Sequence, residues 1–293
     1  MEIIADKVDH LYKFYLHTLT LSDPRVADWL LLDSPCWTIG IVLLYLLIVW
    51  LGPKVMANRE PFTLKWSMMA YNCVCMAISF HIFKENVICG YQLGYSLTCQ
   101  PVVFSYNEFE HRIAKSLWWF YFSKLVEMLD TVFFILRKKN SQLTFLHVYH
   151  HASMFGLWWI GMKWVAGGQS WFGGTLNSFI HLIMYSYYLL AAMGPRMQKY
   201  LWWKRYLTQL QFAQFVIGLI HATQSLYFQC DFPVWMQWAC ILYGITIFSL
   251  FINFYVHAYI RKERLPKAER AEGKKSSNGV STSNGKVDSK KTK

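Results

Sequence analysis

The sequence lacks the features by which secreted and zinc-binding domains are usually recognised. Its first apolar run begins only at Cys36, so we expect an uncleaved signal-anchor rather than a cleaved signal peptide. The seven cysteines fit no disulfide scaffold, and Cys73 and Cys75 have the wrong spacing for a zinc-ligand pair. No soluble basic domain is present, so we expect no nucleic-acid partner. These absences exclude a small disulfide-rich module, a zinc ribbon and a nucleic-acid-binding domain.

Apolar residues are what the chain has in excess. Of its 293 residues, 55% are hydrophobic and 18% aromatic, whereas only 16% are charged. They gather in long runs, which is typical of transmembrane helices. The sequence therefore predicts an all-α membrane protein with seven spans, at residues 36–52, 64–88, 116–136, 143–162, 171–193, 206–228 and 235–258.

The positive charges predict the orientation of these spans. Alternate connections, together with the C-terminal segment, hold 21 of the 29 lysines and arginines, and the other connections hold six. By the positive-inside rule, the N-terminus is lumenal and the C-terminus cytosolic. The net charge of +12 arises mostly from the cytosolic side, where basic residues serve topology and anionic headgroups.

Composition divides the chain into three parts. We expect a lumenal segment at 1–35, a seven-helix domain at 36–261, and a disordered basic cytosolic tail at 262–293, rich in Lys, Ser, Asn and Gly. The tail places Lys290 and Lys291 near its end, in a form that resembles a dilysine retrieval signal. This ending predicts a multi-pass protein of the endoplasmic reticulum membrane.

Three histidines lie together in the fourth predicted span. His147, His150 and His151 occupy positions i, i+3 and i+4, which share one face of a helix. Ionisable side chains at membrane depth are costly unless they are paired or solvated, so they indicate a functional site. The alternative is that they are hydrogen-bonding groups that pack helices together.

Other polar side chains lie in neighbouring spans. The third span places Lys124, Glu127 and Thr131 on one helical face with Asp130 at its edge, and further candidates are Asn177, His181, Tyr185, Gln211 and Gln214. Most lie within about 7–20 Å of the cytosolic end at 1.5 Å per residue. This distribution favours a pocket with a water-soluble reactant at its cytosolic end and a lipid chain beyond. Glu127 and Asp130 could instead form a structural ion triad with Lys124.

Four motifs in order resemble those of the eukaryotic ELO family of very-long-chain fatty acid elongases. They are KLVEMLDT at 124–131, HVYHH at 147–151, NSFIHLIMYSYY at 177–188 and TQLQFAQ at 208–214. Further segments, WLGPK at 50–54 and WWIGMKWVAGGQ at 158–169, resemble the vertebrate members. The resemblance spans roughly residues 25–262.

This resemblance implies a 3-ketoacyl-CoA synthase that condenses a long acyl-CoA with malonyl-CoA and releases CoA and CO2. It implies seven helices, six of which form a barrel of two inverted three-helix units around an acyl tunnel. No cofactor or metal is expected. The expected partners are the two CoA substrates, membrane lipid of the endoplasmic reticulum, the ketoreductase, dehydratase and enoyl reductase of the cycle, and other elongase chains in a homo- or hetero-oligomer.

The catalytic nucleophile is expected to be an imidazole, because none of the seven cysteines adjoins the polar motifs. Our hypothesis is attack by His150 on the thioester, with His151 or His181 as proton partner. Asn177 and the remaining histidine would bind the thioester or enolate oxygen. A non-covalent ternary mechanism fits the same residues.

Two other protein classes are less consistent with these motifs. A di-iron desaturase also contains HxxHH, but it needs about eight histidine ligands in several motifs. Only His147, His150, His151 and His181 are well placed, and no second such motif exists. A seven-helix transporter or receptor gives no reason for a lysine, a glutamate and clustered histidines.

The lumenal side yields two further predictions. Cys99 and Cys230 each lie in a loop facing the oxidising compartment, and we predict a disulfide between them, with Cys36 and Cys89 as alternative partners. An acyl chain that enters from the cytosol would end near the lumenal side. The side chains expected to set its length, unless they form an interfacial belt, are Trp164, Trp171, Phe172, Phe228 and Trp235.

Overall fold

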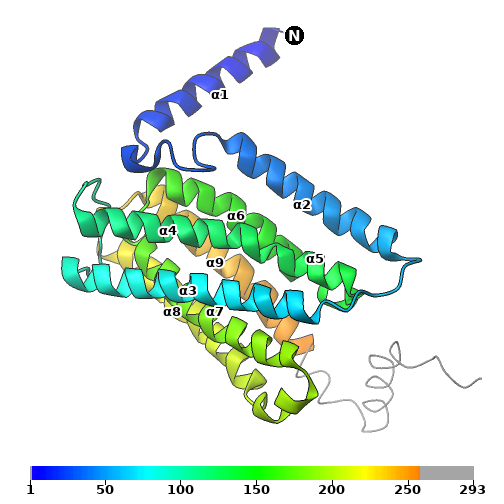
Figure 1. The fold of residues 1–293 in the computed structure, drawn as a ribbon. Coiled ribbons are helices and arrows are strands. Elements are labelled where there is room, and N and C mark those ends of the chain that lie inside the picture. Colours follow the sequence, from blue (N-terminus) through cyan, green and yellow to red (C-terminus); the bar gives the residue numbers. More distant parts are fainter. Residues whose placement is uncertain (1, 258–293) are drawn as a thin grey trace, which may run out of the picture. The chain divides into compact units, whose positions relative to one another are not determined.

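The computed structural model describes residues 2–257, and this part of the chain is helical without strands (Figure 1). The chain divides after Phe248 into two compact units. The helix–helix contacts given below are those within the first unit, up to residue 248. The elements are α1 (Glu2–Thr20), η1 (Pro24–Val26), α2 (Pro35–Met56), α3 (Lys65–Leu93), α4 (Glu108–Glu127), α5 (Leu129–Leu136), η2 (Asn140–Gln142), α6 (Phe145–Trp164), α7 (Ser170–Met193), η3 (Pro195–Tyr200), α8 (Lys204–Tyr227) and α9 (Val234–Tyr255).

Each predicted span coincides with helical structure, and the all-α fold class is confirmed. Four of the described helices, α2, α3, α7 and α9, are long and apolar enough to cross a membrane. The helices α4 and α6 carry the lysine, glutamate and histidine motifs, whose polar side chains lower their hydropathy. The count of seven spans therefore stays a prediction.

The third predicted span is not one continuous helix. α4 ends at Glu127 and α5 begins at Leu129, so that the prediction of a single helix over 116–136 is wrong at Met128. There the backbone N–H groups of Met128 and Thr131 bond three residues back, each at 3.2 Å, which tightens the turn. Thr131 nevertheless remains fully buried.

Local signals explain where the site-bearing helices begin and end. Asn107 caps α4 by accepting from the Phe109 N–H at 2.9 Å. Thr144 Oγ1 caps α6 by accepting from the His147 N–H at 3.2 Å, so this helix begins just before its histidines. α3 stops at Gly94, whose φ of +65° is the left-handed conformation that glycine adopts without strain.

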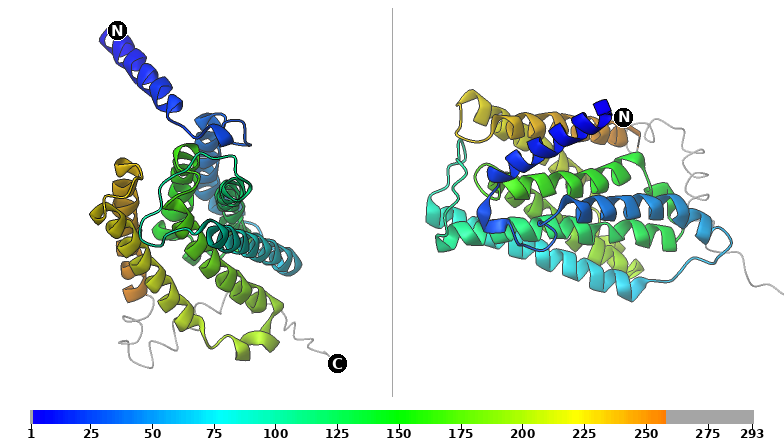
Figure 2. Two further views of the ribbon diagram at one scale, coloured as in Figure 1. Left: turned by 90° about the vertical axis from the view of Figure 1, so that its left-hand side faces the viewer. Right: turned by 90° about the horizontal axis from the view of Figure 1, so that it is seen from above.

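The helices of the first unit are linked by a succession of pairwise contacts. α3 packs against α4 and α7, α4 and α2 pack against α6, α2 also packs against α5, and α7 packs against α8 (Figure 2). α9 meets α6 where the Tyr243 hydroxyl lies 2.8 Å from Ser153 Oγ. It also approaches α8 closely, since a Cβ at Gly244 would lie 2.9 Å from Leu219 Cδ2.

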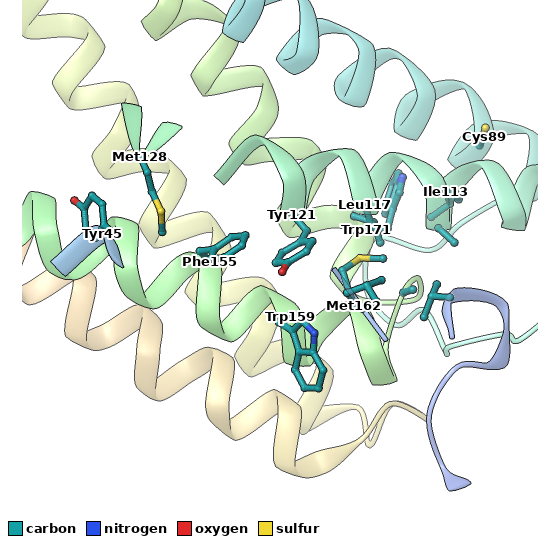
Figure 3. Packing of buried hydrophobic residues seen from close by; sticks show 14 residues of the cluster. Tyr45, Cys89, Ile113, Leu117, Tyr121, Met128, Phe155, Trp159, Met162 and Trp171 are labelled. Atoms are coloured by element: carbon teal, nitrogen blue, oxygen red, sulfur yellow. The ribbon is translucent and has the colours of Figure 1, made fainter. Parts of the chain in front are cut away.

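An apolar core runs along α4 and α6 (Figure 3). The rings of Tyr121 on α4 and Phe155 on α6 stack with centroids 4.8 Å apart and planes at 3°. Both side chains are fully buried, so the van der Waals contacts of the two rings hold α4 against α6. α2 joins this core through Thr38, whose hydroxyl lies 2.7 Å from that of Tyr121.

Connections distant in sequence are tied together at the predicted lumenal end. The Arg25 guanidinium, buried in an ion pair of 2.6 Å with Asp23, donates to the Ser105 and Ala166 carbonyls at 3.2 and 3.1 Å. The connection after α3 and the one before α9 are joined by a disulfide between Cys99 and Cys230, the pair expected from the sequence. The alternative partners Cys36 and Cys89 are free.

Candidate active site

The first polar cluster joins α4 to α7 around the carboxylate of Glu127. Lys124 Nζ donates to Glu127 Oε1 and Oε2 at 2.9 and 3.1 Å, and also to Asn177 Oδ1 at 3.1 Å. His181 Nδ1 lies 3.1 Å from Glu127 Oε1. The lysine and the glutamate are only 2% and 3% exposed. This burial requires the pairing, because an isolated charge would be prohibitively costly there.

Asp130 does not join this cluster as the structural ion triad would require. It accepts a hydrogen bond from the Tyr185 hydroxyl at 3.0 Å, and no ion pair of Asp130 with Lys124 occurs among the described residues. Tyr185 is almost fully buried on α7, one turn after His181, and its ring meets that of His181 at 5.9 Å. The two carboxylates of the motif therefore have different partners.

The three histidines of α6 lie together, as their spacing predicts. The rings of His147 and His151 are 4.3 Å apart between centroids, and those of His150 and His151 are 5.4 Å apart. His151 is buried, whereas the other two are half-buried. No side-chain hydrogen bond of His150 or His151 occurs within residues 2–257, so both keep a ring nitrogen for chemistry.

His147 is held by a second polar chain that reaches α2. Its Nε2 lies 2.8 Å from Thr131 Oγ1, and that oxygen lies 2.9 Å from the hydroxyl of Tyr45. Tyr45 is 4% exposed and Thr131 fully buried. Tyr45 is not among the site residues predicted from the sequence, although it is the one phenol in the apolar run of α2.

The two glutamines of α8 have other surroundings. Gln211 Nε2 contacts Met184 Sδ at 3.6 Å, which places it against α7 rather than on Glu127. Gln214 is half-buried on the same helix. The polar groups that meet directly thus come from α4, α5, α6 and α7, with Tyr45 added from α2.

Comparison with known proteins gives the family of the chain. A model of the ELO: GNS1/SUR4 family matches residues 30–267. The chain belongs to the ELO family. This match confirms the resemblance carried by the four motifs, and all four lie within the matched range.

Individual ELO proteins match over nearly the whole chain. Very long chain fatty acid elongase 4 of Macaca mulatta is 52% identical over 283 residues, covering 97% of this chain and 90% of the relative. The elongase 4 of Mus musculus is 55% identical over 271 residues, covering 92% and 87%. Very long chain fatty acid elongase 5 of Tachysurus fulvidraco is 45% identical, covering 96% and 94%.

Among the five aromatic residues expected to limit chain length, the structure separates buried from exposed ones. Trp171 is 8% exposed, and its Nε1 donates to the Asn86 carbonyl at 2.7 Å. Trp164 and Phe172 are half-buried, and Phe172 stacks on His221 with centroids 4.2 Å apart. Phe228 and Trp235 are 57% and 51% exposed. Only Trp171 is enclosed within the helices of this ELO protein.

Proposed function

We propose that this protein is the condensing enzyme of fatty acid elongation, joining a long or very long acyl-CoA to malonyl-CoA. The products are a 3-oxoacyl-CoA extended by two carbons, CO2 and free CoA. The observation that carries the proposal is the cluster of Lys124, Glu127, Asn177 and His181 beside the α6 histidines, in a chain of the ELO family. Saturated and polyunsaturated chains are both candidate substrates, and the names of the relatives, very long chain fatty acid elongases, support a long acyl chain.

The first chemical step is acyl transfer to an imidazole. A ring nitrogen of His150 attacks the thioester carbonyl, the carbon–sulfur bond breaks, and the CoA thiolate leaves and takes a proton. His151, whose ring touches that of His150, or His181 removes the proton from the acylated ring. His150 suits this role because no hydrogen bond from another described side chain occupies its ring.

The second step is carbon–carbon bond formation. Malonyl-CoA loses CO2, and the enolate carbon attacks the acyl carbonyl while the carbon–nitrogen bond to His150 breaks. Because Asn177 Oδ1 accepts from Lys124, the amide N–H groups of Asn177 are left to donate to an enolate or thioester oxygen. The Lys124 ammonium adds positive charge near that oxygen. A ternary mechanism, in which the enolate attacks the thioester directly, uses the same groups.

Glu127 sets the proton position on His181. With Nδ1 held 3.1 Å from Glu127 Oε1, the proton of the neutral ring lies on Nδ1 and points at the carboxylate. Nε2 is then the basic nitrogen available for proton transfer. Tyr185 donates to Asp130 beside this cluster and orients α7 against α5. We assign Gln211 and Gln214 a substrate contact along α8, where the bound acyl-CoA would supply the partner.

The architecture proposed for this reaction has seven membrane spans, six of which enclose the acyl tunnel as two inverted three-helix units. The pairwise contacts support this architecture. Successive helices touch in the order α3, α4, α6, α9, α8 and α7, and α7 also packs against α3. α2 then lies outside, against α5 and α6.

The location and partners are proposed with it. The active site faces the cytosol, the N-terminus lies in the lumen of the endoplasmic reticulum, and residues 36–261 form the enzyme domain between segment 1–35 and tail 262–293. Lys290 and Lys291, the expected retrieval signal, lie outside the described residues. The product requires a ketoreductase, then a dehydratase and an enoyl reductase, to complete a round of elongation.

A direct assay tests the reaction. Microsomes containing the protein receive labelled malonyl-CoA and acyl-CoAs from about C16 to about C26. The panel covers chain length because each added methylene contributes about 0.8 kcal/mol when it is buried. We expect labelled 3-oxoacyl products from the wild type and none from His150→Ala. His81→Ala is the matched control, because His81 is exposed on α3. A wild type that extends no acyl-CoA overturns the proposal.

Intact-protein mass spectrometry separates the two mechanisms. After incubation with acyl-CoA alone, an acyl adduct should form on the wild type and be absent from His150→Ala. An equal adduct on the variant would move the nucleophile to another residue. No adduct on an active wild type would favour the ternary mechanism. Stoichiometric iron in the purified protein would instead support a desaturase.

A further inference from the structure

α2 presents one phenol to the protein interior. Only Thr38, Tyr45 and Met56 are buried among its 22 residues, and most of its leucines and isoleucines are exposed. The Tyr45 hydroxyl ends 2.9 Å from Thr131 Oγ1 on α5. Burying a phenol in an otherwise lipid-facing helix requires a hydrogen-bond partner. Here that partner is itself bonded to a histidine of the HVYHH motif.

The Thr131 hydroxyl has two hydrogen-bonded neighbours, Tyr45 and His147, but only one proton. It can therefore donate to only one of them. Among the described residues, Tyr45 has no second hydrogen-bond acceptor, and a phenol donates more readily than an alcohol. Tyr45 therefore donates to Thr131 Oγ1, and Thr131 donates its own proton to His147 Nε2 at 2.8 Å. The remaining proton of the neutral His147 ring is then on Nδ1.

We infer that Tyr45 and Thr131 are positioning residues, which fix the tautomer and orientation of His147 against the ring of His151. The 4.3 Å contact between these two rings transmits that orientation to the reacting histidines. Phe134, with its centroid 5.1 Å from that of His147, limits rotation of the ring from another side. This inference rests on the proposed condensation and extends it to a helix outside the proposed six-helix enclosure.

The same helix provides a matched control. Thr38 on α2 and Tyr121 on α4 form a second hydroxyl pair at 2.7 Å, with both side chains buried. This pair also joins α2 to α4, but among the described residues neither side chain has a hydrogen bond or a ring contact with a histidine. Removing either pair costs one buried hydrogen bond, so any difference in catalysis reports the link to His147.

The experiment compares steady-state kinetics of purified full-length variants with both CoA substrates. Tyr45→Phe and Thr131→Val should each lower kcat about three- to tenfold, the value of one hydrogen bond, with KM nearly unchanged. Thr131→Ser should restore kcat to within about twofold of the wild type, because it keeps the hydroxyl. Tyr121→Phe and Thr38→Val should leave kcat within about twofold while shifting the unfolding midpoint as much as Tyr45→Phe does.

A double variant strengthens the test. Tyr45→Phe combined with Thr131→Val should be no slower than Thr131→Val alone, since both remove the same link. The inference is overturned if Tyr45→Phe loses no more kcat than Tyr121→Phe, or if Thr131→Ser fails to restore activity. A wild type that does not extend acyl-CoA would overturn the proposed function. An active wild type whose Tyr45 and Thr131 variants are equally active would overturn only this inference.

Discussion

At the scale of single residues, the site is organised by one buried carboxylate with three neighbours. Glu127 accepts from Lys124, His181 and, at 3.3 Å, Ser123 Oγ. A buried carboxylate is stable only when several donors replace its lost hydration. The same bonds direct Lys124 and His181, so stability and the proposed chemistry depend on the same group.

Glu127→Gln should therefore be costly in both respects. Removing one partner of a buried ion pair leaves the charge of Lys124 uncompensated, which lowers the free energy of unfolding by about 3–5 kcal/mol. Loss of the acceptor for His181 should also lower the condensation rate roughly tenfold or more. The measurements are the thermal unfolding midpoint in detergent and the elongation rate.

Glu85→Gln is the control for this variant. Glu85 pairs with Arg112 at 2.8 Å, but the two side chains are 12% and 32% exposed. A pair in contact with solvent contributes about 0–1 kcal/mol, so the midpoint should move little. Equal shifts of the unfolding midpoint for the two variants would show that the buried Glu127 carboxylate contributes no more to stability than the partly exposed Glu85.

At the scale of elements, close approaches between helices determine where an acyl chain could run. Gly90 on α3 faces Trp171 on α7 so closely that a Cβ there would lie 2.5 Å from the indole Cζ2. The indole is fixed by its bond to the Asn86 carbonyl and by an edge contact with Tyr95, whose ring centroid is 5.4 Å away. Trp171 thus fills the space between α3 and α7 near their predicted lumenal ends.

Trp171→Ala should lengthen the longest product by one or more two-carbon rounds. The truncation opens room for several methylenes, each contributing about 0.8 kcal/mol when buried, and should spare activity on short substrates. It should also lower stability by about 3–5 kcal/mol, as core Trp→Ala changes do. Product profiles from the acyl-CoA panel provide the measurement.

Phe228→Ala and Trp235→Ala should leave the profile unchanged, since both side chains are about half exposed or more. A longer product from either exposed variant, with none from Trp171→Ala, would place the chain-length limit elsewhere. Trp171→Phe should give an intermediate profile, because it keeps most of the ring volume.

At the scale of the whole molecule, a disulfide and a buried ion pair link connections that are distant in sequence. The Cys99–Cys230 bond spans 131 positions in sequence, and the buried Asp23–Arg25 pair joins the N-terminal segment to the α3–α4 connection, which also holds Cys99, and to the α6–α7 connection. Both belong to the end of the molecule away from the histidine motif. These links are thus concentrated at the predicted lumenal end.

Cys99→Ser and Cys230→Ser should each lower stability with little effect on the chemical step. The chain-entropy model gives roughly 4–5 kcal/mol for a loop of this length, an upper value because the helices already hold the ends. Unfolding midpoints with and without reductant measure the effect. Cys36→Ser, at an exposed free cysteine, should be neutral. Peptide mapping that finds Cys99 or Cys230 as a free thiol in the mature protein would contradict the bond.

The sequence by itself determined what depends on neighbours along the chain. Apolar runs produced the helices, because backbone groups in an apolar environment must bond within the segment. The spacing of His147, His150 and His151 determined that they share a face, because the helical repeat is local. The ELO motifs identified the family for the same reason, since they are contiguous.

Tertiary structure alone decided which groups meet across helices. Asn177 and His181 on α7 meet Lys124 and Glu127 on α4, each at 3.1 Å, whereas Asp130 on α5 meets Tyr185 instead. Tyr45 reaches Thr131 across 86 positions of sequence, which no local pattern encodes. Such contacts depend on how each helix is rotated and how closely it packs, and these follow from the shapes of distant side chains.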